Sequence, residues 1–170
     1  MWECSSGVPP THGYGHKSSP GSRRAVESNV VFTSQRRAAI AARKLLLHRV
    51  PAGSVAGIDY SQEKAAARNA AALRNLRVDL RYGSVERMPF PDERFDKALA
   101  INSMQAWPDA RPGLREIRRV LKHGGNVALG FTVNSGQSKE GVAESLTAAG
   151  FAQARIVDRS KLFCAIATKP

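Results

Sequence analysis

An acidic side chain at the end of a predicted strand offers the first candidate chemistry in this sequence. Asp59 directly follows Gly57 and Ile58, which close an apolar run, and Ser61 comes two residues later. A carboxylate at the carboxyl end of a parallel strand can accept hydrogen bonds from both hydroxyls of a ribose. Helped by Ser61, Asp59 can equally cap the helix that follows. The residues alone leave both roles open.

The elements that must position Asp59 alternate along the chain. Apolar runs predict strands at 30–32, 54–60, 77–82, 95–101 and 126–133, while helical spacing predicts helices at 35–49, 62–75, 111–122 and 140–149. Gly124 and Gly125 are expected to end the third helix. Two final runs, 154–158 and 162–168, predict an antiparallel hairpin. The alternation predicts an α/β fold with a doubly wound, mostly parallel sheet that closes in this hairpin.

Length and composition are those of one ordinary folded domain. The chain has 170 residues, of which 42% are hydrophobic and 24% charged. This balance excludes a collagenous, mostly disordered or disulfide-scaffold protein. No run of about 18 apolar residues occurs, so no membrane span is expected. The N-terminus lacks the apolar core of a secretion signal, which predicts a cytoplasmic protein.

The first 28 residues differ in amino-acid composition from the rest. They are rich in Gly, Pro and Ser, and they bury too little apolar surface to offset the entropy of ordering. We therefore expect a disordered tail over 1–28 and one domain over 29–170. His12 and His16 lie near Cys4, but the glycines between them argue against a helix that would place both on one face. No metal site is expected.

The formal net charge of +12 raises nucleic acid as a partner. Residues 29–58 hold five basic side chains and no acidic one. No aromatic side chain is interleaved with these basic residues, so the stacking platforms that bind nucleic-acid bases are missing. A solvated basic helix face is the simpler interpretation, and we expect no nucleic-acid partner.

Three stretches share an order and spacing with a known family: VAGIDYS (55–61), VDLRYGSVERMPFPDERFDKALAINSMQAWPD (78–109) and LREIRRVLKHGGNVALGFT (114–132). Together they resemble the class I S-adenosylmethionine-dependent methyltransferases of the small-molecule type, the type 11-like group. The third stretch is the most specific, with His123 where the family usually has proline. The resemblance covers roughly residues 50–170. It implies a Rossmann-like sheet and S-adenosylmethionine as the cofactor.

The resemblance also implies which residues hold that cofactor. Asp59 would bind the ribose, and Tyr60 would lie against the adenine. Ser84 stands where the family's adenine loop often has a small acidic residue, so that the loop offers a hydroxyl and the backbone N–H of Val85. Asn102 ends the fourth strand, where the family lines the cleft for cofactor and substrate.

Candidates for the substrate cleft follow the same strand. Ser103 shares its end, and Gln105 and Trp107 lie where relatives often carry a histidine. For Gln105 and Trp107, packing on the rim of the cleft is the alternative to substrate contact. The implied reaction moves a methyl group in line from a sulfonium to an oxygen, nitrogen or carbon of a small molecule. Positioning and desolvation carry most of such catalysis, and no catalytic residue is assigned.

The chain departs from the family where a glycine-rich turn should follow the first strand. About twenty residues before Asp59, the sequence is TSQRRAA (33–39), and no glycine occurs between Ser22 and Gly53. Only glycine lets the backbone approach a ligand so closely. We therefore expect the first strand to be incomplete or atypical.

Two explanations of this departure stay open. Deletion, frameshift or a wrong gene start replaced the N-terminal part, or the lineage lost the usual glycine-rich turn that binds the cofactor and uses the basic helix at 35–49 for another purpose. A catalytically inactive scaffold is the main alternative to an enzyme, and a basic nucleic-acid-binding domain is a further one. The sequence pattern does not indicate an oligomeric state.

Overall fold

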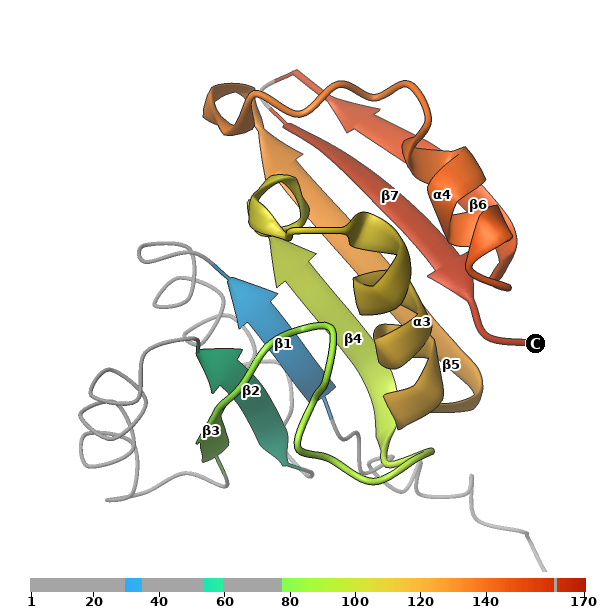
Figure 1. The fold of residues 1–170 in the computed structure, drawn as a ribbon. Helices are drawn as coiled ribbons and strands as arrows, with labels where there is room; N and C mark the ends of the chain where they lie inside the picture. Colours follow the sequence, from blue (N-terminus) through green and yellow to red (C-terminus); the bar gives the residue numbers. More distant parts are fainter. Residues whose placement is uncertain (1–29, 35–53, 60–77, 161) are drawn as a thin grey trace, which may run out of the picture.

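The protein contains a seven-stranded sheet with the order β3-β2-β1-β4-β5-β7-β6 (Figure 1). The computed structural model describes residues 30–34, 54–59, 78–160 and 162–170. The strands are β1 (Val30–Ser34), β2 (Val55–Asp59), β3 (Val78–Tyr82), β4 (Phe95–Ile101), β5 (Leu121–Thr132), β6 (Ala152–Arg159) and β7 (Leu162–Thr168). The first five pair in parallel, and β7 is antiparallel to both β5 and β6. The predicted mostly parallel sheet with a C-terminal hairpin is confirmed.

Two α-helices of the described chain, α3 (Ala110–Val120) and α4 (Val142–Ala148), lie on the same face of the sheet (Figure 1). Short 3-10 helices, η1 (Met104–Ala106) and η2 (Val133–Ser135), follow β4 and β5. Asp109 caps α3 as its side chain accepts a hydrogen bond from the Arg111 N–H at 2.9 Å. The helices predicted at 35–49 and 62–75 and the tail predicted at 1–28 lie outside the described residues.

The core lies between these helices and the sheet. The helix α3 turns apolar side chains inward at three- and four-residue spacing, and alternate residues of β5 meet them from the sheet. The fully buried side chains include Phe95, Leu114, Ile117, Val120, Leu121, Leu129, Phe131 and Leu146. In the described part of the chain, no helix is long and apolar enough to cross a membrane.

The first strand differs from our expectation. β1 has five residues and lies in the middle of the sheet, in regular parallel register with β2 on one side and β4 on the other. The expectation of an incomplete strand was therefore wrong for the backbone. The absence of glycine concerns only the sequence that follows β1, because an apolar run such as 30–32 can pair as a strand whatever turn comes after it.

The two glycines after α3 do not end that helix. α3 ends at Val120, and Leu121 already belongs to β5, where it pairs with Phe95. Gly124 and Gly125 lie within the strand, at the point where the register of β4 and β5 shifts. Gly124 has a φ of 74°, and a Cβ on Gly125 would lie 2.7 Å from the Lys122 carbonyl oxygen. The glycines thus permit an irregularity of the strand, as expected for glycine in a sheet.

Truncating Leu114 tests the packing of α3 on the sheet. Leu114 is fully buried, so Leu114→Ala should lower the free energy of unfolding by about 3 kcal/mol through lost burial and a residual cavity. Arg115 is its exposed neighbour, and Arg115→Ala should change the same quantity by no more than about 0.5 kcal/mol. Urea unfolding followed by circular dichroism measures both, and equal effects would contradict the described orientation of α3.

Candidate functional site

The last residues of β1, β2, β3 and β4 form one row across the sheet, and this row meets β5 two residues before its end. Ser34 of β1 pairs with Ile101 of β4, Ile101 pairs with Gly130 of β5, and Asp59 of β2 pairs with Tyr82 of β3. Ile58 precedes Asp59 and pairs with Thr33, which precedes Ser34, so the row continues from β1 to β2. Between β1 and β4 the chain order reverses, and open α/β sheets bind ligands at this kind of switch point. The predicted site residue Asp59 thus lies at the ligand-binding edge, while Tyr60 lies outside the described residues.

The loop after β3 brings two more predicted residues to this edge. Ser84 and Val85 come directly after Tyr82-Gly83, beside the end of β2. The Ser84 hydroxyl is exposed and accepts a hydrogen bond from the Glu86 N–H at 3.2 Å. The Val85 side chain is buried in the core, and no other residue of the described chain accepts a hydrogen bond from its N–H. This loop therefore offers a backbone donor and a hydroxyl to a ligand.

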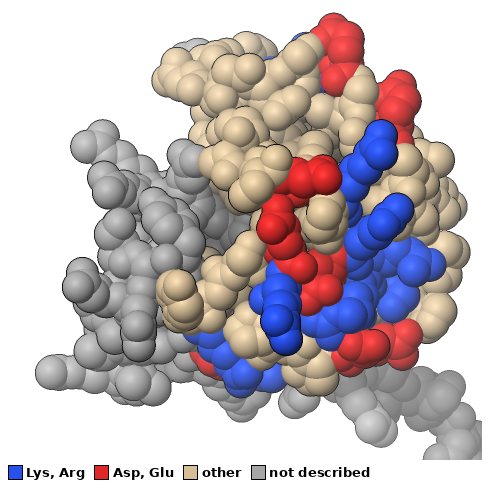
Figure 2. All heavy atoms as spheres, viewed as in Figure 1, with Lys and Arg blue, Asp and Glu red and all other residues tan. Residues whose placement is uncertain are grey.

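An ion pair on α3 holds that loop. Glu116 accepts a hydrogen bond from the Met88 N–H at 2.8 Å and two from Arg119, at 2.6 and 2.8 Å. Arg119 in turn donates to the carbonyl oxygens of Met88 and Phe90, at 3.2 and 2.9 Å, and pairs with Asp92. Acidic and basic side chains lie side by side over this face (Figure 2). The pair thus fixes the path of residues 88–92 through charge-assisted hydrogen bonds.

The ionisation states of the pair follow from this contact. The hydrogen bonds from Arg119 lower the pKa of Glu116, against the opposing effect of burial, and the Met88 N–H lowers that pKa further. The hydrogen bond to Glu116 raises the pKa of Arg119. The sequence predicted a helix over 111–122 but did not indicate that Glu116 and Arg119 bind the loop. The available signal was the i, i+3 spacing of Glu116 and Arg119.

Asn102 connects the ends of β4 and β5. Its side chain donates to the Thr132 hydroxyl at 2.9 Å and accepts from the Thr132 N–H at 2.9 Å. Its backbone N–H donates to the Gly130 carbonyl oxygen at 2.9 Å, and its φ of 44° is left-handed. The two reciprocal bonds hold the strand ends together. A direct contact of Asn102 with a cofactor stays a prediction.

Two of the three predicted substrate residues pack against each other. The Trp107 indole N–H donates to the Ser103 hydroxyl at 2.8 Å, and Ser103 is 5% exposed. The Trp107 ring lies on α3 at Gly113, where a Cβ would come within 2.9 Å of the ring and 3.2 Å of Val85. Gln105 is exposed. The structure thus shows the packing role for Trp107, while substrate contact by Ser103, Gln105 and Trp107 stays a prediction.

His123 lies away from this edge. It is near the start of β5, at the opposite end from Thr132. Its Nδ1 atom is 2.7 Å from the Pro170 oxygen, and its Nε2 atom is 3.1 Å from the Glu93 carboxylate. This position excludes His123 as a base at the carboxyl edge of the sheet.

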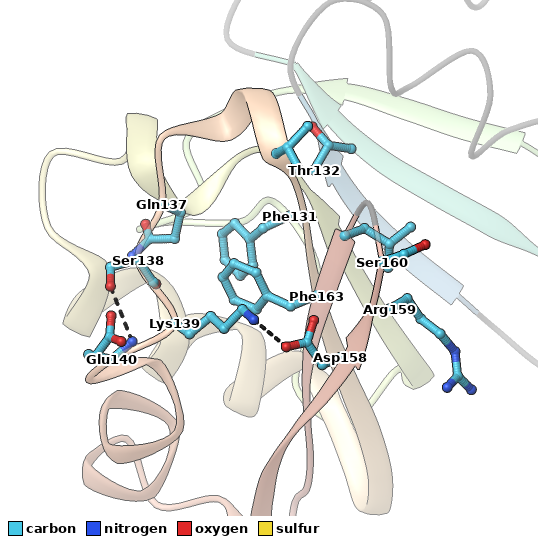
Figure 3. A pocket seen from close by; sticks show the side chains of 12 residues that line it. Phe131, Thr132, Gln137, Ser138, Lys139, Glu140, Asp158, Arg159, Ser160 and Phe163 are labelled. Atoms are coloured by element: carbon cyan, nitrogen blue, oxygen red, sulfur yellow. Dashed lines mark hydrogen bonds and ion pairs between the residues drawn. The ribbon is translucent and has the colours of Figure 1, made fainter.

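A pocket of about 480 Å³ opens at the end of β5 (Figure 3). It is walled by the segment after β5 and by the β6–β7 turn, and the lining residues include Phe131, Thr132, Gln137, Lys139, Asp158 and Phe163. Its volume falls within the range of about 300–1,000 Å³ typical of small-molecule sites. Sequence reasoning missed this pocket because residues 131–140 and 158–163 meet only through strand pairing. Among the described residues, no His, Cys, Asp and Glu cluster suited to a metal ion occurs.

Comparisons with known proteins identify the class and then the family. Residues 38–129, more than half of the chain, match the family described as a methyltransferase domain. The Bacillus subtilis protein YrhH, named as a methyltransferase, is 28% identical over 127 residues, which cover 74% of this chain and 71% of YrhH. A rice 2-methyl-6-phytyl-1,4-hydroquinone methyltransferase is 35% identical over 81 residues, covering 47% of this chain and 23% of that protein.

Solved structures agree on the fold. A SAM-dependent methyltransferase from Aquifex aeolicus superposes with a TM-score of 0.71 at 20% identity, covering 85% of this chain and 84% of that one. The [4+2]-cyclase SpnF superposes with a TM-score of 0.66 at 22% identity, covering 85% of this chain and 76% of that one. The fold is that of a Rossmann-like, S-adenosylmethionine-dependent methyltransferase. This chain belongs to the methyltransferase-domain family.

The described residues fit the adenosine part of S-adenosylmethionine. An acidic residue ends β2, and the next strand over leads into the exposed Ser84 hydroxyl and the Val85 N–H. A carboxylate suits a ribose diol, and a backbone N–H suits an acceptor nitrogen of adenine. The turn after β1 that would face the methionine part lies outside the described residues.

Lowering the pH tests the ion pair on α3. Because the folded-state pKa of Glu116 is depressed, the pair stabilises the protein above the ordinary carboxyl pKa, and this contribution is lost as pH falls from about 5 to 3. The unfolding free energy of the wild type should therefore exceed that of Glu116→Gln at pH 7 and approach it near pH 3. The exposed Glu144 of α4 supplies the control variant Glu144→Gln. A pH-independent gap for Glu116→Gln would contradict the assignment.

Filling Gly113 tests the contact between Trp107, α3 and the loop. Gly113→Ala improves helix propensity by up to about 1 kcal/mol, but its Cβ would press on the Trp107 ring, and overpacking costs about 1–3 kcal/mol. We expect a net loss of unfolding free energy in urea titrations. In Trp107→Phe, which has a smaller ring, the same substitution should cost less, which gives a favourable coupling in a double-mutant cycle. Strict additivity would refute the contact.

Proposed function

We propose that this chain transfers a methyl group from S-adenosylmethionine to a small-molecule acceptor. The observation that carries the proposal is the row of strand ends at the switch point, which sets Asp59 beside the loop of Ser84 and Val85. The methyltransferase-domain match supports it. The relatives' names support a small acceptor: besides the rice hydroquinone enzyme, a demethylmenaquinone methyltransferase of Listeria monocytogenes is 35% identical over 80 residues. A cytoplasmic location is part of this proposal.

In this proposal, each site residue has one task. Asp59 accepts hydrogen bonds from the ribose hydroxyls, Tyr60 lies against the adenine, and the Val85 N–H and Ser84 hydroxyl contact its edge. Asn102 borders the cofactor through the backbone that its bonds to Thr132 hold. These contacts position and desolvate the reactants, which is the main requirement of a transfer between an activated donor and a nucleophile.

The bound cofactor supplies a methyl group on a positively charged sulfur, already activated for displacement. Transfer would break the bond from that carbon to sulfur and form the bond to the acceptor, whose proton would leave to solvent. The products are the methylated acceptor and S-adenosylhomocysteine. The substrate cleft is expected beside the segment after β4, where Ser103, Gln105 and Trp107 lie.

A second candidate is a scaffold that keeps the fold without the cofactor. It rests on the sequence TSQRRAA at 33–39, which lacks the glycine-rich turn. A basic nucleic-acid-binding role gains less support. The side chain of Arg119 is paired with the carboxylates of Asp92 and Glu116, and Lys122 is paired with Asp96.

Calorimetric titration with S-adenosylhomocysteine separates the enzyme from the scaffold. We expect measurable, weak binding. Asp59→Ala should weaken binding by about tenfold or more, because hydrogen bonds to a charged group contribute about 1.5–3 kcal/mol. Ser84→Ala should weaken it by less than about threefold, since a neutral hydrogen bond contributes less. The exposed Arg115 supplies the control variant Arg115→Gln, which should bind as the wild type does.

Two results would contradict the proposal. No heat of binding at millimolar S-adenosylhomocysteine would leave the scaffold as the function. Equal affinities of the wild type and Asp59→Ala, with both proteins folded by circular dichroism, would remove the ribose role of Asp59. A salt-dependent mobility shift with mixed RNA or DNA would favour the nucleic-acid role instead, because phosphate contacts weaken with salt.

A further inference from the structure

We propose that α3 carries a docking surface for an acidic helix of a partner protein. The surface, which we call the arginine stripe, consists of Arg111, Arg115 and Arg118. All three belong to a helix whose neighbouring segments, from 78 to 160, are described without a gap. The inference goes beyond the proposed methyl transfer and does not depend on it, because the stripe lies outside the row of strand ends.

The spacing of the three arginines places them on one side of α3. Positions i, i+4 and i+7 of a helix lie above one another, and the opposite side of α3 is buried at Leu114 and Ile117. Arg111 and Arg115 are exposed, and Arg118 is half-buried. The stripe is about 10 Å long along the helix axis, which is the length of two helical turns. It therefore has the size and direction of a contact with one other helix.

The charges of the stripe have no carboxylate partners within the described chain. None of its three guanidinium groups forms an ion pair with a described residue, whereas Arg119 of the same helix pairs with both Asp92 and Glu116. Helix geometry separates the two groups, because Glu116 and Arg119 bind the loop on one flank of α3 and Arg118 reaches the end of α4 on the other. Three unpaired positive charges in one line favour an anionic partner through electrostatic complementarity.

Arg118 is held in place before any partner binds. Its Nε–H donates to the carbonyl oxygen of Gly150, which follows α4, at 2.9 Å. A Cβ on Gly150 would lie 3.1 Å from that Nε atom, so the close approach requires glycine. No described residue accepts a hydrogen bond from the two terminal nitrogens of Arg118. Such a fixed guanidinium can donate both of these nitrogens to one carboxylate, and less side-chain entropy is lost on binding.

The carboxylates beside the stripe favour a narrow partner over a broad polyanion. Acidic and basic side chains lie side by side on the face that carries α3 (Figure 2). Glu116 and Glu86 both belong to the loop flank of the helix, where they bind the N–H groups of Met88 and Asp109. A nucleic-acid duplex or an anionic membrane would cover these carboxylates as well as the stripe, and the like charges would repel it. A helix, about 10–12 Å wide, can lie along the stripe alone.

The sequence of the chain excludes a second copy of itself as the source of that helix. A matching row needs acidic residues at i, at i+3 or i+4, and at i+7, so that they face the stripe from one side. No three acidic residues of the 170-residue chain have this spacing. The partner is therefore a different protein, one that presents carboxylates along one side of an exposed helix. Its contact with the stripe is small, as in transient complexes.

A nuclear magnetic resonance titration of the full chain with two designed peptides tests the docking surface. The first is an alanine-based helical peptide with glutamates at positions i, i+4 and i+7. The second has the same composition with glutamates at i, i+2 and i+5, which spreads them around the helix. We expect the first peptide to shift the backbone signals of residues 111–118 and to bind about fivefold more tightly than the second, because only its carboxylates reach all three arginines at once.

Substitutions in the stripe should weaken the first peptide. Arg111→Gln combined with Arg115→Gln removes two of the ion pairs, and we expect about fivefold weaker binding. Both positions are exposed, so circular dichroism should show the wild-type fold. Arg155 of β6 is an exposed arginine outside the stripe, and Arg155→Gln should bind the first peptide as the wild type does.

Several results would overturn the inference. Equal affinities of the two peptides, unchanged binding in the double variant, or signal shifts confined to other segments would exclude the arginine stripe as a docking surface. A DNA duplex or anionic phospholipid vesicles that shifted the signals of 111–118 at lower concentrations than the first peptide would exclude an acidic helix as the occupant. None of these results concerns methyl transfer, which the titration with S-adenosylhomocysteine tests separately.

Discussion

The ion pair between Glu116 and Arg119 is the constraint on which the candidate cofactor site depends. The two residues lie one turn apart on α3, and their side chains bind the backbone of Met88 and Phe90 and the carboxylate of Asp92. Residues 83–94 form a loop with little regular structure, so fixed donors and acceptors from α3 replace the missing strand bonds. Because Glu116 is largely buried, with 15% of its side chain exposed, its carboxylate requires these partners. The helix that packs on the core thereby also determines where Ser84 and Val85 lie.

The edge of the sheet connects this loop with the rest of the site. Parallel pairing through a central β1 places the ends of three other strands at one level, and the reciprocal bonds of Asn102 and Thr132 extend the edge to β5. On one side of this edge lie the residues suited to adenosine, and on the other lies the pocket between β5 and the hairpin. The same framework in SpnF belongs to a cyclase. Function in this fold therefore depends on what the strand-end loops carry.

The local sequence pattern was enough to predict most strands of the sheet. The strand at 95–101 was predicted with the bounds that the structure shows, β2 is shorter than predicted by one residue at each end, and β3 is shorter by one residue at its start. The boundary of α3 was wrong because glycine ends helices and interrupts strands alike, and only the pairing of Leu121 with Phe95 decides between them. The prediction that β1 is incomplete rested on the sequence that follows it. The regular pairing of β1 comes instead from β2 and β4, which lie on either side of it.

The sequence by itself determined the fold class, the family and the candidates Asp59, Ser84, Val85 and Asn102, because hydrophobic period and motif order are properties of consecutive residues. The tertiary structure decided what those residues touch. It turned Asn102 toward Thr132 and Trp107 toward Ser103, and it made Glu116 and Arg119 the support of a loop 27–31 positions earlier in the chain. It also created the pocket by bringing Lys139 to Asp158. These contacts depend on strand order and register, which bring distant segments together and which no local pattern contains.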